Sequence, residues 1–215
     1  MIFDCSDPEQ RATGIASAIS AVKEGRLVVL PTDTVYGIGA DAFDNLAVAA
    51  LLSAKGRGRD MPVPVLVGSW HTIDGLVYSV PHAARALIEA FWPGALSLVV
   101  RQAPSLQWDL GDAHGTVMLR MPLHPVAIEL LREVGPMAVS SANISGRPPA
   151  ITAEDAQRQL GDLVEVYLDA GQSEQQAAST IVDLTGAAPR ILRAGPITAG
   201  DLATVLGVDA ATLTD

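Results

Sequence analysis

The chain is poor in cysteine, in aromatic residues and in positive charge. Cys5 is the only cysteine among 215 residues, so the sequence predicts neither an internal disulfide nor a cysteine-based zinc site. Lys and Arg number 14 against 24 Asp and Glu, which gives a formal net charge of -10. This balance argues against broad non-specific binding to nucleic acid, because such binding depends on neutralising phosphates. With 4% aromatic residues, a platform that stacks single-stranded bases is not expected either.

Long apolar runs are missing as well. No stretch reaches the ~18 apolar residues of a membrane-spanning helix, and Asp4, Asp7 and Glu9 stand where a secretory leader would be basic and then apolar. We therefore expect a cytoplasmic protein without a membrane segment. The hydrophobic content of 49% is ample for a buried core. We expect one domain over residues 1–215, with its core at about 12–206 and a short tail after it.

Helical and strand patterns alternate along most of the chain. Apolar spacing typical of helices occurs before Gly25 and at residues 45–55, 81–91, 125–134, 152–160 and 198–206. Runs typical of strands occur at residues 27–30, 63–67, 95–100, 117–121, 137–140, 164–168, 180–184 and 190–192. The class is α/β, and the late strands without intervening helices predict an open sheet that is partly antiparallel. Residues 171–178 are polar and predict a mobile loop.

Small polar side chains gather directly after two of these strands. Residues 31–41 and 140–146 combine Thr, Ser, Asp and Asn with glycine, and loops after strand ends are favoured ligand positions. The same side chains are also typical of turns that bond only their own backbone. Neither a dinucleotide fingerprint nor a phosphate-binding P-loop is present, and no serine stands in a Gly-x-Ser-x-Gly elbow. His71, His82, His114 and His124 show no metal-ligand spacing, so we expect no dedicated protein metal site.

Positive charge is concentrated in one short segment. Residues 55–59 read Lys-Gly-Arg-Gly-Arg, which reverses the sign of the chain locally. Such a run can bind an anion through its cations and backbone amides. Alternatively, it can be a helix end whose solvated cations interact favourably with the helix dipole. Farther along, Thr116, Met118 and Arg120 share one face of a predicted strand. Arg120 can then bind a carboxylate with two donors or form a structural ion pair.

Seven short motifs, taken in order, resemble the YrdC-like threonylcarbamoyl-AMP synthase family in its short, single-domain form. They are Pro31-Thr32-Asp33-Thr34-Val35-Tyr36-Gly37, Lys55-Gly56-Arg57, Trp92-Pro93-Gly94, Arg120-Met121-Pro122, Ser141-Ala142-Asn143-x-Ser145-Gly146, Ser179-Thr180-Ile181-Val182-Asp183 and Leu192-Arg193. The resemblance spans residues 12–206. It implies a twisted open sheet, mixed parallel and antiparallel, flanked by helices and carrying a concave central cavity.

The resemblance also implies a reaction. L-threonine, bicarbonate and ATP would give threonylcarbamoyl-AMP and pyrophosphate, and a downstream tRNA threonylcarbamoyl transferase complex would modify adenosine 37 of tRNA. Mg²⁺ would arrive with ATP, without a protein site of its own. Thr34, Arg120 and Ser179 are implied to bind threonine. ATP is implied to contact Lys55, Arg57, Thr116, Ser141, Asn143 and Arg193, and Lys55 and Arg57 are the expected catalytic residues.

The sequence departs from the family pattern at three positions. Met61 stands where Asn is common, Leu66 where a His faces threonine, and Ser140 where Pro is common. These departures leave the amino-acid specificity open. The alternatives are an RNA-binding module without catalysis, with the basic run on phosphates, and a carbamoyl-adenylate transferase like that of hydrogenase maturation proteins. A weak direct contact with tRNA is left open in either case.

Overall fold

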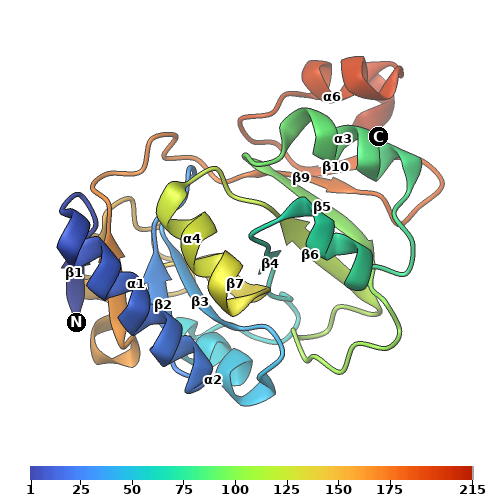
Figure 1. The fold of residues 1–215 in the computed structure, drawn as a ribbon. Coiled ribbons are helices and arrows are strands. Elements are labelled where there is room, and N and C mark those ends of the chain that lie inside the picture. Colours follow the sequence, from blue (N-terminus) through green and yellow to red (C-terminus); the bar gives the residue numbers. More distant parts are fainter. Residues whose placement is uncertain (215) are drawn as a thin grey trace.

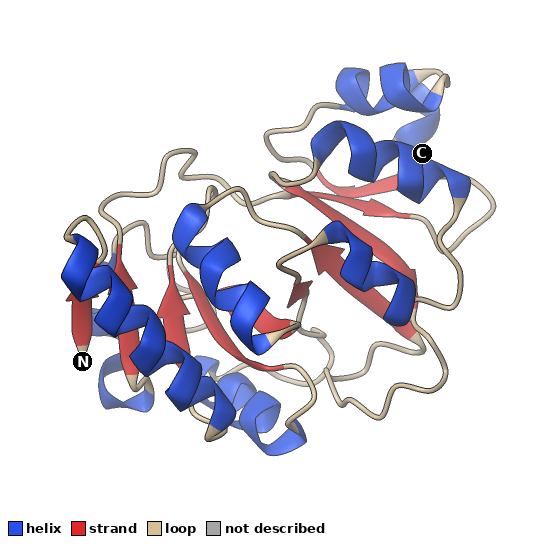
Figure 2. Cartoon of the chain, viewed as in Figure 1, coloured by secondary structure: helices blue, strands red, loops and turns tan. Residues whose placement is uncertain are grey.

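A ten-stranded sheet runs through the structure, a computed structural model in which residues 1–214 are described. Figure 1 shows helices on both faces of this sheet, and Figure 2 separates the element types by colour. The strands are β1 (Ile2–Asp4), β2 (Val28–Leu30), β3 (Gly37–Asp41), β4 (Val65–Leu66), β5 (Leu96–Arg101), β6 (Thr116–Arg120), β7 (Met137–Ser141), β8 (Val166–Asp169), β9 (Thr180–Asp183) and β10 (Arg190–Arg193).

The helices lie between these strands in the sequence. They are α1 (Pro8–Lys23), α2 (Asn45–Lys55), α3 (His82–Phe91), α4 (Pro125–Val134), α5 (Ala153–Leu160) and α6 (Ala199–Leu206), with 3₁₀ turns η1 (Trp70–Gly75), η2 (Gly161–Leu163) and η3 (Ala210–Leu213). No helix within residues 1–214 combines the length and the apolar character needed to cross a bilayer.

The sheet is open and mixed, as the sequence predicted. Its strand order is β1-β8-β2-β3-β7-β4-β6-β5-β9-β10. β8 is parallel to both β1 and β2, β4 to β6, and β5 to β9, whereas the other neighbours are antiparallel. β4 contributes only two residues, which pair with β7 on one side and β6 on the other. The sheet is therefore narrowest in its middle.

Successive side chains of the strands belong to two different apolar clusters. Val28 and Leu30 of β2 pack in one cluster with α1 and α4, while Val29 between them packs in the other, with α2 and α5. A strand places successive side chains on opposite faces, so both faces of this half of the sheet are covered. In Figure 1, α1 and α4 lie over β2 and β3, whereas α3 and α6 lie at the other end of the sheet.

A local signal sets each end of α2. Asp44 caps the start of the helix by accepting hydrogen bonds from the amides of Leu46 and Ala47, at 2.9 and 3.0 Å. Gly56 follows the helix with φ 59°, a left-handed conformation that favours glycine. The chain therefore turns sharply between Lys55 and Arg57.

Several elements differ from the sequence-based prediction. β1, β3 and η1 were not predicted, and residues 210–213 of the expected tail form η3, where Leu213 is buried. β3 was read as part of a polar loop because Gly37 and Gly39 have low strand propensity. In the structure a Cβ on Gly37 would lie 2.6 Å from a side-chain carbon of Val139, so glycine permits β3 and β7 to pair closely.

Candidate functional site

A cavity of about 280 Å³ opens over the middle of the sheet. Strands from both halves contribute to it: β3 and β7 from one side, and β5, β6, β9 and β10 from the other. Its lining consists of Thr32, Thr34, Val35, Tyr36, Gly37, Arg57, Pro64, Leu66, Ser97, Met118, Arg120, Val139, Ser140, Ser141, Pro149, Ala178, Ser179, Ile181 and Arg193. The cavity thus joins polar loops and strand ends that are far apart in the sequence.

Arg120 lies at the base of this cavity and is almost fully buried. Its Nη1 donates to Thr34 Oγ1 at 2.8 Å, its Nε to the carbonyl of Gly94 at 2.9 Å, and its Nη2 to the carboxylate of Asp33. Burial lowers the pKa of Arg120, and the charge of Asp33 acts in the opposite direction. An arginine has five N–H donors, so two remain, one on each terminal nitrogen. These two donors can bind the carboxylate of a ligand.

Asp33 holds this arginine in place and was not singled out from the sequence. Its Oδ1 also accepts a hydrogen bond from the amide of Leu123 at 3.0 Å, and the residue is 3% exposed. Its Oδ2 is buried with no protein partner among the described residues. The signal for Asp33 was its place between Thr32 and Thr34 in a polar segment, but the sequence did not reveal that Arg120 would be its partner.

Ser179 and Arg193 form a second polar wall. The hydroxyls of Ser97 and Ser179 lie 2.8 Å apart, and both serines are buried. Arg193 donates from Nε and Nη2 to the carbonyl of Ser179 at 3.0 and 2.9 Å, and from Nη2 to its hydroxyl at 3.1 Å. Partial burial lowers the pKa of Arg193. Ser179 is therefore fixed by a serine on one side and a cation on the other.

Three oxygen atoms bind the side chain of Arg57, which lines the cavity. It donates to the carbonyls of Met61 and Pro62 at 2.8 and 3.1 Å, and to Ser140 Oγ at 2.9 Å. Burial lowers its pKa. The last contact gives Ser140, one of the departures from the family pattern, a definite structural role. Arg57, Arg120 and Arg193 thus place three guanidinium groups along one cavity.

Lys55 and Asn143 are buried and do not line the cavity. Lys55 is 2% exposed, and its ammonium donates to the carbonyls of Ser141 and Asn143 at 2.5 and 2.7 Å. A longer contact of 3.3 Å reaches Asn143 Oδ1. Burial, together with the charge of Arg57, lowers the pKa of Lys55 to about 8. Neither Lys55 nor Asn143 belongs to the cavity lining, whereas Ser141 does.

Thr116 lines an adjoining apolar hollow of about 200 Å³. This hollow shares Met118 with the main cavity and is bounded by Pro62, Val63, Val99, Leu110, Ala113, Val117 and Leu192. Thr116 Oγ1 donates to the carbonyl of Ala113 at 2.7 Å. The hollow is mostly apolar and adjoins the polar main cavity.

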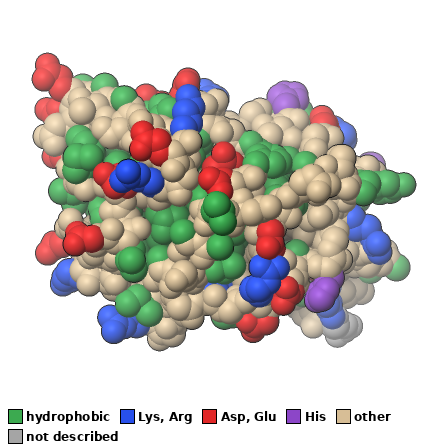
Figure 3. All heavy atoms as spheres, turned by 90° about the horizontal axis from the view of Figure 1, so that it is seen from below, with side chains coloured by type: hydrophobic (Ala, Val, Ile, Leu, Met, Phe, Trp, Pro, Cys, Tyr) green, Lys and Arg blue, Asp and Glu red, His purple; other side chains and the backbone are tan. Residues whose placement is uncertain are grey.

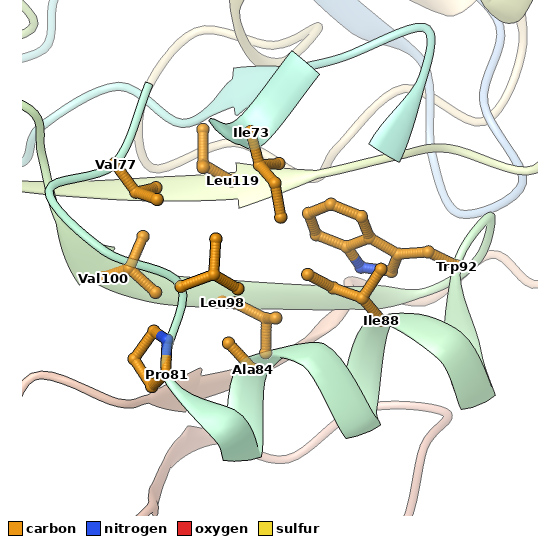
Figure 4. Close-up of a pocket in the computed structure, with 10 residues that line it drawn as sticks. Ile73, Val77, Pro81, Ala84, Ile88, Trp92, Leu98, Val100 and Leu119 are labelled. Carbon is orange, nitrogen blue, oxygen red and sulfur yellow. The ribbon is translucent and has the colours of Figure 1, made fainter. Parts of the chain in front are cut away.

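Two further features of the molecule offer less chemistry. Figure 4 shows a small void between η1, α3 and the strands β5 and β6, where Ile73, Ile88 and Leu98 face one another. It is apolar throughout and holds only about 10 Å³. On the face seen in Figure 3, Lys and Arg side chains lie scattered among Asp and Glu and form no basic stripe. Within residues 1–214, no group of three His, Cys, Asp or Glu side chains is arranged to hold a metal ion.

Comparison with known proteins places this chain among close relatives. The family model Sua5/YciO/YrdC, described as "Telomere recombination", matches residues 20–195. A Mycobacterium tuberculosis protein provisionally named threonylcarbamoyl-AMP synthase is 80% identical over 211 residues, which cover 98% of this chain and 97% of the relative. The threonylcarbamoyl-AMP synthase of Bacillus subtilis is 36% identical over 195 residues, covering 90% of this chain and 56% of that enzyme.

Solved structures share the fold. The crystal structure of Pyrococcus abyssi Sua5 complexed with L-threonine superimposes with a TM-score of 0.89 at 32% identity, and covers 96% of this chain. This chain spans 61% of that longer protein. Escherichia coli YciO has a TM-score of 0.78 at 23% identity, covering 91% of this chain and 94% of its own, which supports the fold alone.

Proposed function

The chain belongs to the Sua5/YciO/YrdC family, and from this premise we propose that it is a threonylcarbamoyl-AMP synthase, a nucleotidyltransferase that serves tRNA modification. The observation that carries the proposal is the buried Arg120, which keeps two unused donors beside Thr34 in a cavity large enough for substrate. Relatives bearing the same enzyme name over nearly the full length of the chain support it.

L-threonine would bind at the base of the cavity. Its carboxylate would take the two free donors of Arg120, and the hydroxyls of Thr34 and Ser179 lie along the same cavity. Leu66 lines the cavity too and offers no hydrogen bond, so polar contacts to the threonine side chain would come from the serine pair. The L-threonine complex of the P. abyssi protein supports this assignment, because the two proteins share the fold.

ATP would occupy the outer part of the cavity and the adjoining hollow. Arg57 and Arg193 would lie on its phosphates, Ser141 would contact its nucleoside, and the adenine would enter the apolar hollow beside Thr116 and Met118. Mg²⁺ would come with the nucleotide, since the one acidic group beside Arg120, Asp33, is already paired with it. When bound, the ion would neutralise charge on the phosphates.

The reaction needs no protein nucleophile. The threonine amine would combine with CO₂ from bicarbonate to give a carbamate and release a proton to solvent, and a carbamate oxygen would then attack the α-phosphorus of ATP. A new O–P bond forms, the bond from the α-phosphorus to the bridging oxygen breaks, and pyrophosphate leaves. The chain's own part would be to bring two anionic substrates together and to offset their charge with Arg57, Arg120 and Arg193. The product would pass to a transferase that acts on tRNA.

A pyrophosphate-release assay tests the proposal. Purified protein would be incubated with ATP, Mg²⁺ and bicarbonate, together with L-threonine, L-serine or no amino acid, and the adenylate would be identified by mass spectrometry. We expect threonine-dependent pyrophosphate release, and its loss in Arg120→Met but not in the surface variant Arg59→Met. Release at the same rate without an amino acid, or none at all, would contradict the proposal.

A further inference from the structure

We propose that Lys55 is a positioning residue that organises the nucleotide loop, residues 141–147, from beneath and does not touch the phosphates. The loop's ligand is the nucleotide of the proposed function, and to that extent the inference rests on it. The assignment departs from the role that the basic run at residues 55–59 suggested. It comes from where the ammonium group lies and from what it already binds.

All three N–H donors of the Lys55 ammonium group have an acceptor in the loop. Lysine carries three N–H donors, and three loop oxygens lie within 3.3 Å of Nζ: the carbonyls of Ser141 and Asn143, and Oδ1 of Asn143. The residue is 2% exposed and lies outside the cavity lining. A phosphate could reach the ammonium only if the loop moved and gave up these contacts.

The backbone of Lys55 also forms a hydrogen bond to this loop. Its carbonyl accepts a hydrogen bond from the amide of Ser145 at 2.8 Å, so the last turn of α2 contacts the loop through both side chain and main chain. Asn143 completes the arrangement, because its Nδ2 donates to the carbonyls of Ile144 and Arg147 at 2.9 and 2.8 Å. The loop is thus closed around one buried cation.

This geometry has an electrostatic consequence for the cavity. The carbonyls of Ser141 and Asn143 direct their negative ends to the ammonium, so their partial charge is offset there. With those two oxygens facing Lys55, the Ser141 side chain and the guanidinium of Arg57 remain along the cavity. Lys55 therefore acts on the nucleotide through the loop it holds.

Removing the cation would leave buried acceptors without a donor. In Lys55→Met the two oxygens of Asn143 would lose their donor and the carbonyl of Ser141 would keep only the amide of Asn143, and because buried acceptors left unpaired are costly, the loop would rearrange. A rearranged loop weakens every nucleotide that contacts it, whatever its number of phosphates. A lost phosphate ligand would instead weaken ATP far more than adenosine.

Lysine labelling tests the placement without any need for catalysis. The sequence has two lysines, and the exposed Lys23 serves as an internal control for the buried Lys55. The native protein would be treated with an amine-acetylating reagent and the two sites quantified by mass spectrometry, alone, with adenosine and with ATP. We expect Lys55 to react at least tenfold more slowly than Lys23 in the free protein. Equal rates, or protection of Lys55 by ATP but not by adenosine, would overturn the proposal.

Nucleotide affinities give the second test. Adenosine, AMP and ATP would be titrated against the native protein, Lys55→Met and the matched surface variant Arg59→Met by calorimetry. We expect Lys55→Met to weaken all three by a similar factor of about ten or more, and Arg59→Met to change none. A loss confined to ATP would refute the positioning role. If the native protein bound no nucleotide, the proposed function would fail, whereas the labelling result would still decide where Lys55 lies.

Discussion

The carboxylate of Asp33 and the guanidinium of Arg120 form a buried ion pair at the base of the cavity. Arg120 is 6% exposed and Asp33 3%, so each charge depends mainly on the other for compensation. Arg120 reaches Thr34 and Gly94 with its other donors, and the pair therefore fixes the plane of the guanidinium. The orientation of the two free donors follows from this arrangement.

Asp33→Asn should impair threonine binding and stability together. Loss of the carboxylate leaves a buried cation without its counter-charge, which typically costs about 3 kcal/mol or more. We expect the free energy of unfolding to fall by about that amount, and the KM for threonine to rise at least tenfold while the KM for ATP changes less. Denaturant unfolding and steady-state kinetics measure the two effects.

The matched control is Asp109→Asn, which removes the partner of Arg59 at the surface. Exposed ion pairs contribute about 0–1 kcal/mol, so this variant should keep its stability and both KM values. Equal losses in the two variants would mean that the Asp33–Arg120 pair has no special part in the site.

Arg193→Lys should behave unlike a conservative change. The guanidinium donates twice to the carbonyl of Ser179 and once to its hydroxyl, and an ammonium cannot reproduce this planar fork. We expect pyrophosphate release to fall by about tenfold or more, which corresponds to ~1.4 kcal/mol. Arg190→Lys, with its more exposed ion pair to Asp183, is the control that should remain active. Native activity in Arg193→Lys would show that charge alone suffices there.

Gly195→Ala should displace the segment that carries Ser179 in the cavity wall. A Cβ at this position would lie 2.6 Å from the carbonyl oxygen of Ala178 and 2.6 Å from the carbonyl carbon of Ser179. Since these are backbone atoms, the segment that carries Ser179 must move. We expect a loss of stability of about 1–3 kcal/mol and reduced activity. Gly186→Ala meets its first neighbour at 3.8 Å and should be neutral in both assays.

The contribution of Lys55 to stability should increase with pH. Its pKa is about 8 in the folded protein, lowered by burial and by Arg57, against 10.5 for an unperturbed lysine. Between these values the unfolded chain binds a proton that the folded protein has released, so the folded state gains as pH rises. At about 1.4 kcal/mol per pKa unit, the gain amounts to about 3 kcal/mol.

The pH effect is measured as a difference between two proteins. The free energy of unfolding of the native protein and of Lys55→Met would be determined from pH 7 to about 10.5, so that groups common to both cancel. The difference should be constant below about pH 8 and should then rise in favour of the native protein. A flat difference over the whole range would show that Lys55 keeps an ordinary pKa.

The sequence located most of the site but not its internal contacts. Thr34, Arg57, Arg120, Ser141, Ser179 and Arg193 were all identified from motifs, and all line the cavity, although their roles stay predictions. Lys55 and Asn143 are expected to bind ATP, a role that stays a prediction; in the structure they bind each other and do not line the cavity. Their contact joins residues 88 positions apart, and a motif shows that two residues matter without showing that they face each other.

The same limit applies to the fold. The helices with clear apolar spacing and end signals, such as α2 between Asp44 and Gly56, were predicted from local sequence. β3 was not predicted, because glycine has a low strand propensity. The glycines of β3 instead permit the close approach of β7. Elements defined by a distant neighbour carry little signal in their own residues.

The two-residue strand β4 has a consequence for how the protein unfolds. With the adjoining Pro64 and Val67, it joins the half of the sheet made of β1, β8, β2, β3 and β7 to the half made of β6, β5, β9 and β10. The cavity has residues of both halves in its walls. Substrates that fill it would add contacts between the halves where the sheet supplies few. A ligand that binds only the folded protein would then stabilise both halves at once, in addition to the apolar cluster that already spans them.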